Sequence, residues 1–301
     1  MSDAKATRAG AVALVGWTNV GKSTLLNRLI GDKIAAVADV AQTTRQRIKG
    51  VLHADDGSQI AFVDTPGLHR PRHRMNRAMV EAARQTIHNV DLVVMMVDAC
   101  RGYGPGDRET AEMLREAGVE RLLVLNKIDR VSPKSRLLPL MQQAVEQLGF
   151  DEVVPISAAT GEGCDRLVEL LLARLPQGPA LYPGDYLTDQ SERSIAGELI
   201  REKVLRLTNQ ELPHATAVLI DRWHEREDGL VEIEGSILVD RESQRQIVIG
   251  RSGQLIKRIG SEARRDLERL LDRRVFVRLW VKVRKDWRDD ERTLRELGLG
   301  G

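Results

Sequence analysis

Cysteines, aromatic residues and long apolar runs are scarce in this chain of 301 residues. Its two cysteines, Cys100 and Cys164, form no C-x-x-C pair, which argues against a disulfide framework or a cysteine-based zinc site. We expect both to pack as small apolar residues in a reducing, intracellular setting. The longest apolar runs, such as 92–97, are too short to cross a bilayer. Because residues 1–10 also lack the apolar core of a signal peptide, the sequence predicts a cytoplasmic protein.

A net charge of either sign is also lacking, since 46 Lys and Arg against 44 Asp and Glu give +2. Aromatic residues make up only 3% of the chain, so base stacking cannot dominate any binding of nucleic acid. Apolar residues, at 42%, are numerous enough for a packed core, and the length suits two domains.

Short apolar runs alternate with helical patterns over residues 11–175. We expect strands at 11–15, 48–53, 60–63, 92–97, 122–125 and 153–156 and helices at 22–30, 76–87, 107–117, 137–148 and 164–175. Strands that alternate with helices require crossover connections. The predicted fold is therefore an α/β domain, with a mostly parallel six-stranded sheet and helices on both faces.

The pattern stops at residues 176–185, where three prolines and two glycines occur in ten residues. We expect a linker at 176–190, between a first domain at 1–175 and a second at 191–301. In the second domain, a helix at 192–207 precedes strands at 216–221 and 230–239, two helical stretches and a strand at 275–283. This α–β–β–α–α–β order ends in a polar C-terminal helix.

A phosphate-binding loop is predicted from G-x-x-x-x-G-K-[ST], which is matched by Gly16-Trp17-Thr18-Asn19-Val20-Gly21-Lys22-Ser23. The match follows a predicted strand and opens a predicted helix, as the motif requires. Its backbone N–H groups can surround phosphate oxygens, and Lys22 can reach the β- and γ-phosphates. The Ser23 hydroxyl can bind Mg²⁺, and we include the next residue, Thr24, among the nucleotide-binding residues.

A second motif, Asp64-Thr65-Pro66-Gly67, ends the strand predicted at 60–63. Its carboxylate can hold Mg²⁺ through water, and the N–H of Gly67 can reach the γ-phosphate. We count Asp64 and Gly67 with Lys22 as catalytic candidates and Leu68 with the nucleotide-binding residues.

Recognition of guanine is predicted from Asn126-Lys127-Ile128-Asp129, which follows the strand at 122–125. The carboxylate of Asp129 can accept from both N1–H and the 2-amino group of guanine, whereas adenine has neither donor there. The stem of Lys127 can lie along the base. The turn Ser157-Ala158-Ala159, after the last predicted strand, can bring a backbone N–H to guanine O6.

Together these segments resemble the TRAFAC-class GTPases, and the rest of the chain resembles the bacterial Era family. The similar segments include GWTNVGKSTLLN, AQTTRQRI, VDTPGLHRPRHRMNRAM, LYPGDYLTDQSERSIAGELIREK, IVIGRSGQLIKRIG and VKVRKDWRDDERTLRELG. The resemblance implies GTP or GDP and Mg²⁺ as cofactors, a type II KH domain, and a monomer. It also implies binding to the 3′ end of 16S ribosomal RNA in maturation of the 30S subunit. Thr44, or Thr43 beside it, would then bind Mg²⁺ and act in catalysis.

Two positions bear on the expected catalytic rate. Leu68 stands where Ras-like enzymes carry a glutamine that positions water, and an apolar side chain cannot do so. We therefore expect slow intrinsic hydrolysis. Asn19 matches an asparagine of potassium-stimulated relatives, and we hypothesise that it helps to hold K⁺; a loop-shaping hydrogen bond is the alternative.

Trp17 and Thr18 depart from the family, which usually has proline at the second loop position.

An RNA-binding loop of the KH type is predicted at Gly250-Arg251-Ser252-Gly253, with Lys257 and Arg258 shortly after it. Residues 241–288 hold 15 Lys and Arg against 6 Asp and Glu, whereas residues 211–240 hold 2 against 8. This asymmetry favours a basic RNA groove. Trp287 could contact RNA or pack in the core.

The sequence thus predicts a GTP-hydrolysing switch that binds ribosomal RNA. Two alternatives stay open. One is an RNA-binding module that senses nucleotide without hydrolysing it, and the other is a signalling GTPase that makes peripheral contact with the inner membrane.

Overall fold

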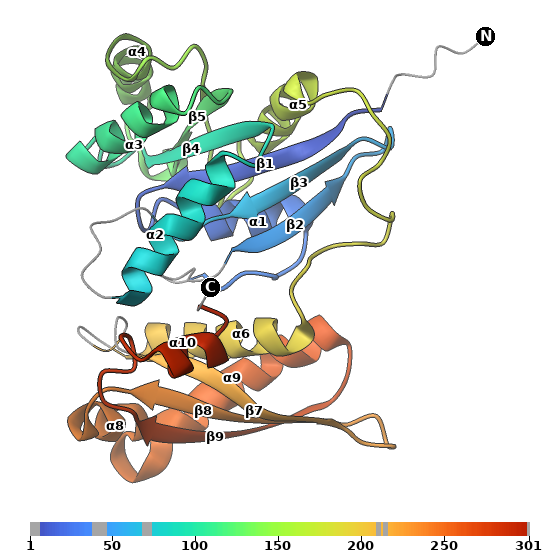
Figure 1. Cartoon of the computed structure of the whole chain (residues 1–301), viewed down its shortest axis with the longest axis vertical. Helices are drawn as coiled ribbons and strands as arrows, with labels where there is room; N and C mark the ends of the chain where they lie inside the picture. The colour runs from blue at the N-terminus through green and yellow to red at the C-terminus, as the bar shows by residue number, and fades with distance from the viewer. Residues whose placement is uncertain (1–6, 38–46, 68–73, 209–211, 213–215, 300–301) are drawn as a thin grey trace. The chain divides into compact units, whose positions relative to one another are not determined.

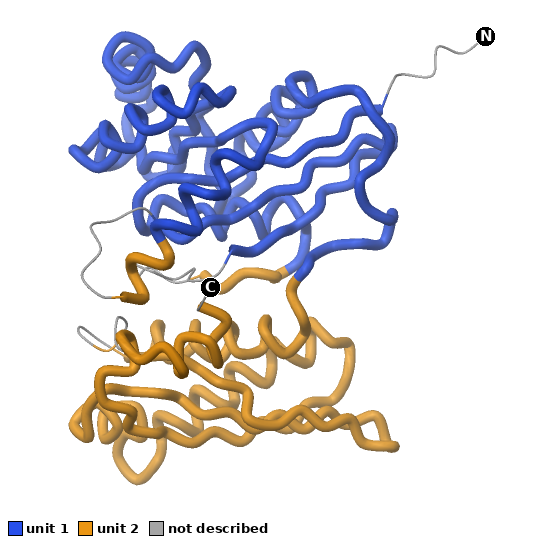
Figure 2. Tube along the Cα trace, in the orientation of Figure 1, with its two compact units in different colours: residues 1–32, 44–70, 80–189 blue, residues 33–43, 71–79, 190–301 orange. Residues whose placement is uncertain are grey.

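The structure is a computed structural model that describes residues 7–37, 47–67, 74–208, 212 and 216–299. It divides into two compact units (Figure 2). Unit 1 comprises residues 1–32, 44–70 and 80–189, and unit 2 comprises residues 33–43, 71–79 and 190–301. Of the described residues in the N-terminal half of the chain, 33–37 and 74–79 therefore pack with the C-terminal half.

Unit 1 contains a six-stranded sheet in the order β2-β3-β1-β4-β5-β6. Only β2 runs antiparallel to its neighbour, so the predicted mostly parallel sheet is confirmed. The strands are β1 (Ala9–Gly16), β2 (Ile48–His53), β3 (Gln59–Asp64), β4 (Leu92–Asp98), β5 (Arg121–Asn126) and β6 (Val153–Pro155).

Helices cover both faces of this sheet (Figure 1). One face carries α2 (Arg74–Ile87), α3 (Pro105–Glu116) and α4 (Leu137–Leu148), which share one apolar core with β4. The other face carries α1 (Lys22–Ile30) and α5 (Cys164–Arg174), and 3₁₀ turns η1 (Ile128–Arg130) and η2 (Lys134–Arg136) follow β5. Because both faces are covered, every residue of β4 is buried, which explains its continuous apolar run.

The two cysteines differ in burial. Cys164, at the start of α5, is buried as expected, but Cys100 is exposed and the expectation that it packs inside is wrong. Cys100 lies in a turn just after β4, where its backbone N–H donates to Asp98 Oδ1 at 2.9 Å. The turn carries the side chain away from the buried strand.

Residues 176–189 contain no helix or strand; residues 176–178 pair with the start of β1, and residues 182–189 lie along the outer strand β2. The backbone N–H of Val51 donates to the carbonyl of Leu187 at 2.9 Å, and His53 Nε2 lies 2.9 Å from the carbonyl of Tyr186. The prolines and glycines of this segment prevent regular structure, yet its backbone still forms hydrogen bonds with unit 1.

Unit 2 has the element order α–β–β–α–α–β that the sequence predicts. Its elements are α6 (Glu192–Leu207), β7 (Ala217–Glu225), β8 (Val231–Val239), α8 (Glu242–Ile249), η3 (Arg251–Gly253), α9 (Gln254–Leu271), β9 (Val275–Val283) and α10 (Glu291–Glu296). In the sheet, β8 pairs antiparallel with β7 and parallel with β9. Strand β7 extends beyond the predicted 216–221 because its polar end pairs with the start of β8.

The two faces of this sheet have separate cores, since alternate residues of β8 point in opposite directions. Val231, Ile233 and Ile237 pack with α6 and α9. On the opposite face, Leu238 packs with the fully buried indole of Trp287. Met75, Met79, Ala217 and Leu294 complete this second cluster. Of the two roles open for Trp287, the structure therefore supports packing in the core.

Among the described residues, no helix is both long enough and apolar enough to cross a membrane.

We predict that Trp287→Ala destabilises unit 2 by about 3–5 kcal/mol, because it removes a large buried side chain and leaves a cavity. Trp280, which is 40% exposed on β9, is the matched control, and Trp280→Ala should cost about 1 kcal/mol or less. Urea unfolding followed by circular dichroism gives both free energies. Equal losses would contradict the assignment of Trp287 to the core.

Candidate functional site

Four predicted site segments of unit 1 meet at one edge of the sheet. Gly16, Asp64 and Asn126 are the last residues of β1, β3 and β5, and Ser157 follows β6. These strands run parallel, so their carboxyl ends lie at the same edge, where α/β folds commonly bind ligands.

The phosphate-binding loop is held in a conformation that its glycines permit. Gly16 and Gly21 have φ values of 144° and 102°, and Asn19 has 64°, in the left-handed region that asparagine tolerates. A Cβ atom at Gly16 would lie 2.4 Å from the carbonyl oxygen of Met96. One at Gly21 would lie 2.3 Å from Asn126 Nδ2, so neither position accepts a larger residue without rearrangement.

Lys22 is buried and turns back over this loop. Its Nζ donates to the carbonyls of Gly16 at 3.1 Å and Trp17 at 3.2 Å. Burial lowers the pKa of Lys22, while the negative charge of Asp64 acts in the opposite direction. Since burial disfavours the ammonium, an anionic ligand such as a phosphate would stabilise it further. Helix α1 begins here with no side-chain cap on its first N–H groups, which suits an anion.

The predicted magnesium ligands Ser23 and Asp64 lie together. The Ser23 hydroxyl donates to Asp64 Oδ2 at 2.7 Å, and both residues are buried. A hydroxyl and a carboxylate are oxygen ligands of the kind that Mg²⁺ prefers, so the residues present fit this ion. Thr44, the third predicted ligand, lies outside the described residues, as do Thr43 and Leu68.

The turn after β3 lies against the phosphate-binding loop. A Cβ atom at Gly67 would be 2.8 Å from Thr18 Cγ2 and 3.2 Å from the Thr18 nitrogen. The Thr65 hydroxyl donates to the carbonyl of Leu14 at 2.8 Å, which joins the turn to β1. Gly67 and Pro66 are both buried. The close approach places the Gly67 backbone beside the loop, as a contact to a γ-phosphate requires.

The predicted guanine-binding residues are bonded to one another and to the loop. Asn126 Nδ2 donates to the carbonyl of Val20 at 2.8 Å, and the N–H of Ala158 donates to Asn126 Oδ1 at 2.9 Å. The Ser157 hydroxyl donates to Asp129 Oδ1 at 2.7 Å, which orients that carboxylate. Ile128, between these residues, is buried.

Lys127 connects three segments through its ammonium group. With φ at 66°, its backbone is in the left-handed region, and Nζ donates to the carbonyl of Asn19 at 2.6 Å. Nζ also lies 2.8 Å from Asp98 Oδ2. Burial would raise the pKa of Asp98, but the hydrogen bonds from Lys127 and the Cys100 N–H, together with the charge of Lys127, outweigh it and keep this pKa below its usual value. Asp98 therefore remains ionised at the end of β4.

Asp98 and Arg28 belong to the site but are absent from the sequence-based candidates. Asp98 ends β4 as Asp64 ends β3, so a polar residue after an apolar strand was an available signal. Arg28 of α1 donates to the carbonyls of Ala158 and Ala159 and so supports the turn that follows β6. No sequence pattern indicates this contact, because it joins residues about 130 positions apart.

The indole of Trp17 lies on the first turn of α3. A Cβ atom at Gly106 would be 2.3 Å from the six-membered ring of Trp17. Trp17 thus packs against glycine backbone beside the phosphate-binding loop, which gives this departure from the family pattern a specific partner.

The predicted RNA loop lies between α8 and α9 of unit 2. Gly250, Ser252 and Gly253 all have positive φ values, of 72°, 49° and 75°. A Cβ atom at Gly250 would lie 2.6 Å from Leu255 Cβ, so the loop turns too tightly for another residue. The side chains of Arg251, Lys257 and Arg258 are exposed around it. Arg258 also pairs with Glu262 at 2.9 Å.

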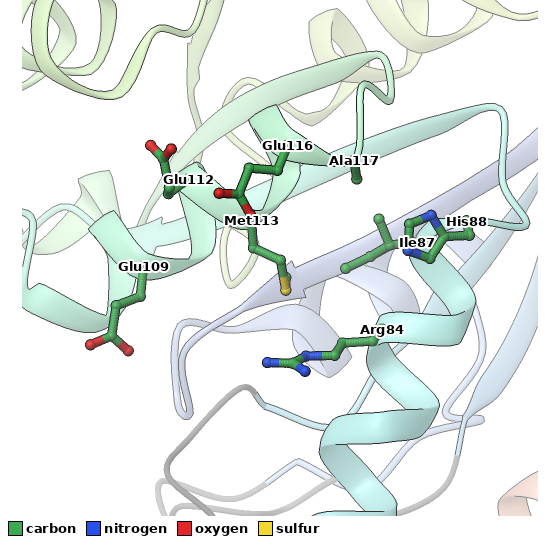
Figure 3. Close-up of a pocket in the computed structure, with 8 residues that line it drawn as sticks. All are labelled: Arg84, Ile87, His88, Glu109, Glu112, Met113, Glu116 and Ala117. Carbon is green, nitrogen blue, oxygen red and sulfur yellow. The ribbon is translucent and has the colours of Figure 1, made fainter.

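A pocket of about 540 Å³ lies elsewhere in unit 1, between the C-terminal part of α2 and α3 (Figure 3). It is lined by Arg84, Ile87, His88, Glu109, Glu112, Met113, Glu116 and Ala117. None of these residues belongs to the nucleotide or RNA candidates, so the pocket is separate from the predicted chemistry.

Comparison with known families defines the class of protein. The family described as a 50S ribosome-binding GTPase matches residues 11–127, and the KH domain family matches residues 211–288. The chain is therefore a P-loop GTPase domain followed by a C-terminal KH domain.

Similarity to individual proteins then narrows this class. GTPase Era of Geobacter metallireducens is 50% identical over 292 residues, which cover 97% of each chain. GTPase Era of Trichlorobacter lovleyi is 48% identical over 293 residues, with the same coverage. The chain belongs to the Era family of GTPases.

Two solved Era structures are also similar over the whole chain. Aquifex aeolicus Era bound to GDP·AlF₄⁻ matches with a TM-score of 0.94 and 39% identity. Era in complex with MgGDPNP and nucleotides 1506–1542 of 16S ribosomal RNA matches with a TM-score of 0.95 and 39% identity. Each match covers 98% of this chain and 100% of the other.

We predict that Asp129→Asn lowers the affinity for GTP by about 100-fold or more, because an amide cannot accept two hydrogen bonds from guanine on the same edge. Xanthosine triphosphate carries a carbonyl in place of the 2-amino group, and its affinity should rise. Competition binding with labelled GDP measures both. Asp151→Asn, at an exposed position before β6, is the control and should change neither affinity. Unchanged preference for GTP in Asp129→Asn would contradict this role of the carboxylate.

Proposed function

We propose that this protein hydrolyses GTP and uses the bound nucleotide to control its binding to the 3′ end of 16S ribosomal RNA, during maturation of the small ribosomal subunit in the cytoplasm. The observation that carries the proposal is the convergence of Lys22, Ser23, Asp64 and Asp129 on one sheet edge. The solved relative that holds both MgGDPNP and nucleotides 1506–1542 supports it.

In this proposal the residues from Gly16 to Thr24 surround the phosphates with backbone N–H groups. Lys22 is positioned to neutralise the β- and γ-phosphate oxygens, and Gly67 donates its N–H to the γ-phosphate. Ser23, Asp64 and Thr44 are the residues that would hold Mg²⁺, which supplies positive charge for the phosphates. Leu68 cannot orient a water molecule, so hydrolysis is slow without a further contribution.

Guanine would bind between Lys127 and the 157–159 turn. Asp129, oriented by Ser157, accepts from N1–H and the 2-amino group, and a backbone N–H of Ala158 or Ala159 faces O6. The N–H of Ala158 already donates to Asn126. We therefore favour the N–H of Ala159 as the donor to O6. Adenine would leave the Asp129 carboxylate unpaired, which disfavours ATP.

The RNA would bind at the loop formed by Gly250, Arg251, Ser252 and Gly253. Because the glycines of this loop have no side chains, the phosphates of single-stranded RNA can approach its backbone and the N-terminus of α9. The exposed cations of Arg251, Lys257 and Arg258 would add charge around the same phosphates.

The test of this function compares RNA affinity in two nucleotide states. A fragment that spans nucleotides 1506–1542 should bind at least about fivefold more tightly with MgGDPNP than with GDP, because two coupled sites shift each other's affinity. Fluorescence anisotropy at fixed salt gives both dissociation constants. Equal affinities would contradict control of RNA binding by nucleotide.

The role of the loop is tested in the same assay. Lys257→Ala should weaken RNA binding in both nucleotide states and reduce the dependence of affinity on salt by about one ion. Lys285→Ala, outside the loop, controls for loss of general positive charge.

We also propose that Asn19 helps to hold K⁺ beside the phosphates. Asn19→Gly keeps the left-handed backbone accessible but removes the side-chain oxygen. Wild-type single-turnover hydrolysis should be faster in K⁺ than in Na⁺, and Asn19→Gly should abolish the difference. A wild type that is equally fast in both salts would contradict the role of K⁺.

A further inference from the structure

Unit 2 contains a cluster of four charged side chains that no step of the proposed function uses. Lys33 Nζ lies 2.8 Å from Glu202 Oε1 and 2.9 Å from Asp266 Oδ2. Lys203 Nζ lies 3.0 Å from Glu202 Oε1 and also pairs with Asp266 Oδ2. Two ammonium groups thus alternate with two carboxylates, and we call these four residues the charge cluster. The exposed guanidinium groups of Arg206 and Arg269 each pair with one of these carboxylates as well.

Three members of the charge cluster are almost completely buried. The side chains of Glu202, Lys203 and Asp266 are 1%, 4% and 10% exposed, whereas Lys33 is 37% exposed. Burial alone would raise the pKa of Glu202, but hydrogen bonds from Lys33 and the Val37 N–H outweigh it and lower this pKa. Burial also opposes ionisation of Asp266 and Lys203, but their mutual hydrogen bond lowers the pKa of Asp266 and raises the pKa of Lys203. Glu202, Lys203 and Asp266 therefore stay ionised at neutral pH.

One carboxylate fixes a whole segment of chain. Oε1 of Glu202 accepts from Lys33, and Oε2 accepts from the backbone N–H of Val37 at 2.9 Å. The residues between them, Ile34, Ala35 and Ala36, are each at most 3% exposed. Residues 33–37 are consequently held to α6 and α9, and they belong to unit 2 by their contacts (Figure 2).

Residues 33–37 lie between two groups of proposed nucleotide-binding residues in the sequence. This segment begins three residues after the end of α1, the helix that starts with Lys22 and Ser23. Thr44, the proposed magnesium ligand, follows Val37 by seven residues. Residues 33–37 are therefore covalently connected, over short distances, to nucleotide-binding residues on both sides.

The other end of the charge cluster leads to the RNA loop. Asp266 lies in α9, which begins at Gln254 directly after Gly253. Asp266 follows Gln254 by twelve positions, a distance of about 18 Å along the helix at 1.5 Å per residue. Asp266 and the loop are therefore joined by one continuous, packed helix.

Stability alone gives a weak account of the charge cluster. Replacing buried ion pairs by apolar residues of similar volume is often neutral or stabilising, because desolvation offsets their attraction. A buried cluster that joins two functional segments is better explained by a specific arrangement that it enforces.

We propose that the charge cluster couples the nucleotide site to the RNA loop, with Glu202 and Asp266 as positioning residues that tie residues 33–37 to α6 and α9. This inference rests on the proposed function and names the residues through which it operates. Since coupling between two binding sites is reciprocal, the cluster conveys RNA binding to the nucleotide as well.

The experiment breaks the charge cluster at its most exposed member. The full chain is assayed for binding to the fragment of nucleotides 1506–1542 with MgGDPNP and with GDP. Lys33→Met removes one cation and leaves Lys203 paired with both carboxylates. Lys33→Arg keeps the charge, and Arg166→Met removes a cation from an exposed pair within α5.

In the wild type, Lys33→Arg and Arg166→Met, the two affinities should differ at least fivefold, and in Lys33→Met by less than twofold. If the ratio of the two affinities in Lys33→Met equals that of the wild type, this inference is overturned and the proposed function stands. An equal loss of affinity in both nucleotide states leaves the ratio unchanged and has the same consequence. Equal affinities in the wild type overturn the proposed function and this inference with it.

Thermal unfolding checks that each variant is folded. Should Lys33→Met not fold, Lys33→Gln replaces it, because its amide retains hydrogen-bond donors without the charge. The ratio of RNA affinities with MgGDPNP and with GDP in that variant then tests the inference by the same limits.

Discussion

The side-chain amide of Asn126 is bonded at both of its polar atoms, to the carbonyl of Val20 and to the N–H of Ala158. It therefore joins the loop that would contact phosphates to the turn that would contact the base. A Cβ atom at Gly21 would lie 2.3 Å from Nδ2 of this same amide. The loop therefore already lies against Asn126, and moving it closer to β5 would break the hydrogen bonds of that side chain. Asn126 thus helps to fix the distance between the segment that would contact the phosphates and the segment that would contact the base, a distance that a nucleotide of fixed length requires to be constant.

Charged groups around Asn126 reinforce the same arrangement. Lys127 ties the loop to Asp98 at the end of β4, and Arg28 supports the turn from α1. Each of these contacts pairs a charge with a carbonyl or a carboxylate in a partly buried setting, where such bonds are stronger than in water. These contacts restrict how far the segments can move relative to one another, and such restriction reduces the entropy lost when a ligand binds.

The sequence predicted the elements well because their patterns are local. The bounds of α1, α4 and α6 agree with the apolar periodicity, and β2 and β9 were placed at their observed residues. The sequence could not predict Arg28 or the charge cluster, since both depend on residues brought together from distant parts of the chain. From sequence alone, the three helical residues Glu202, Lys203 and Asp266 are expected to be solvated. Their burial is seen only in the structure. Cys100 was misplaced because its expected burial rested on residue type, and free cysteine is usually buried, whereas its position in a turn after β4 exposes it.

The contact between Trp17 and Gly106 has an evolutionary corollary. The two positions lie 89 residues apart, yet the indole occupies the space that any side chain at 106 would need. A larger residue at 106 would collide with the indole, so a relative with such a residue should carry a smaller one at 17. Alignments of the family should show these two columns changing in concert.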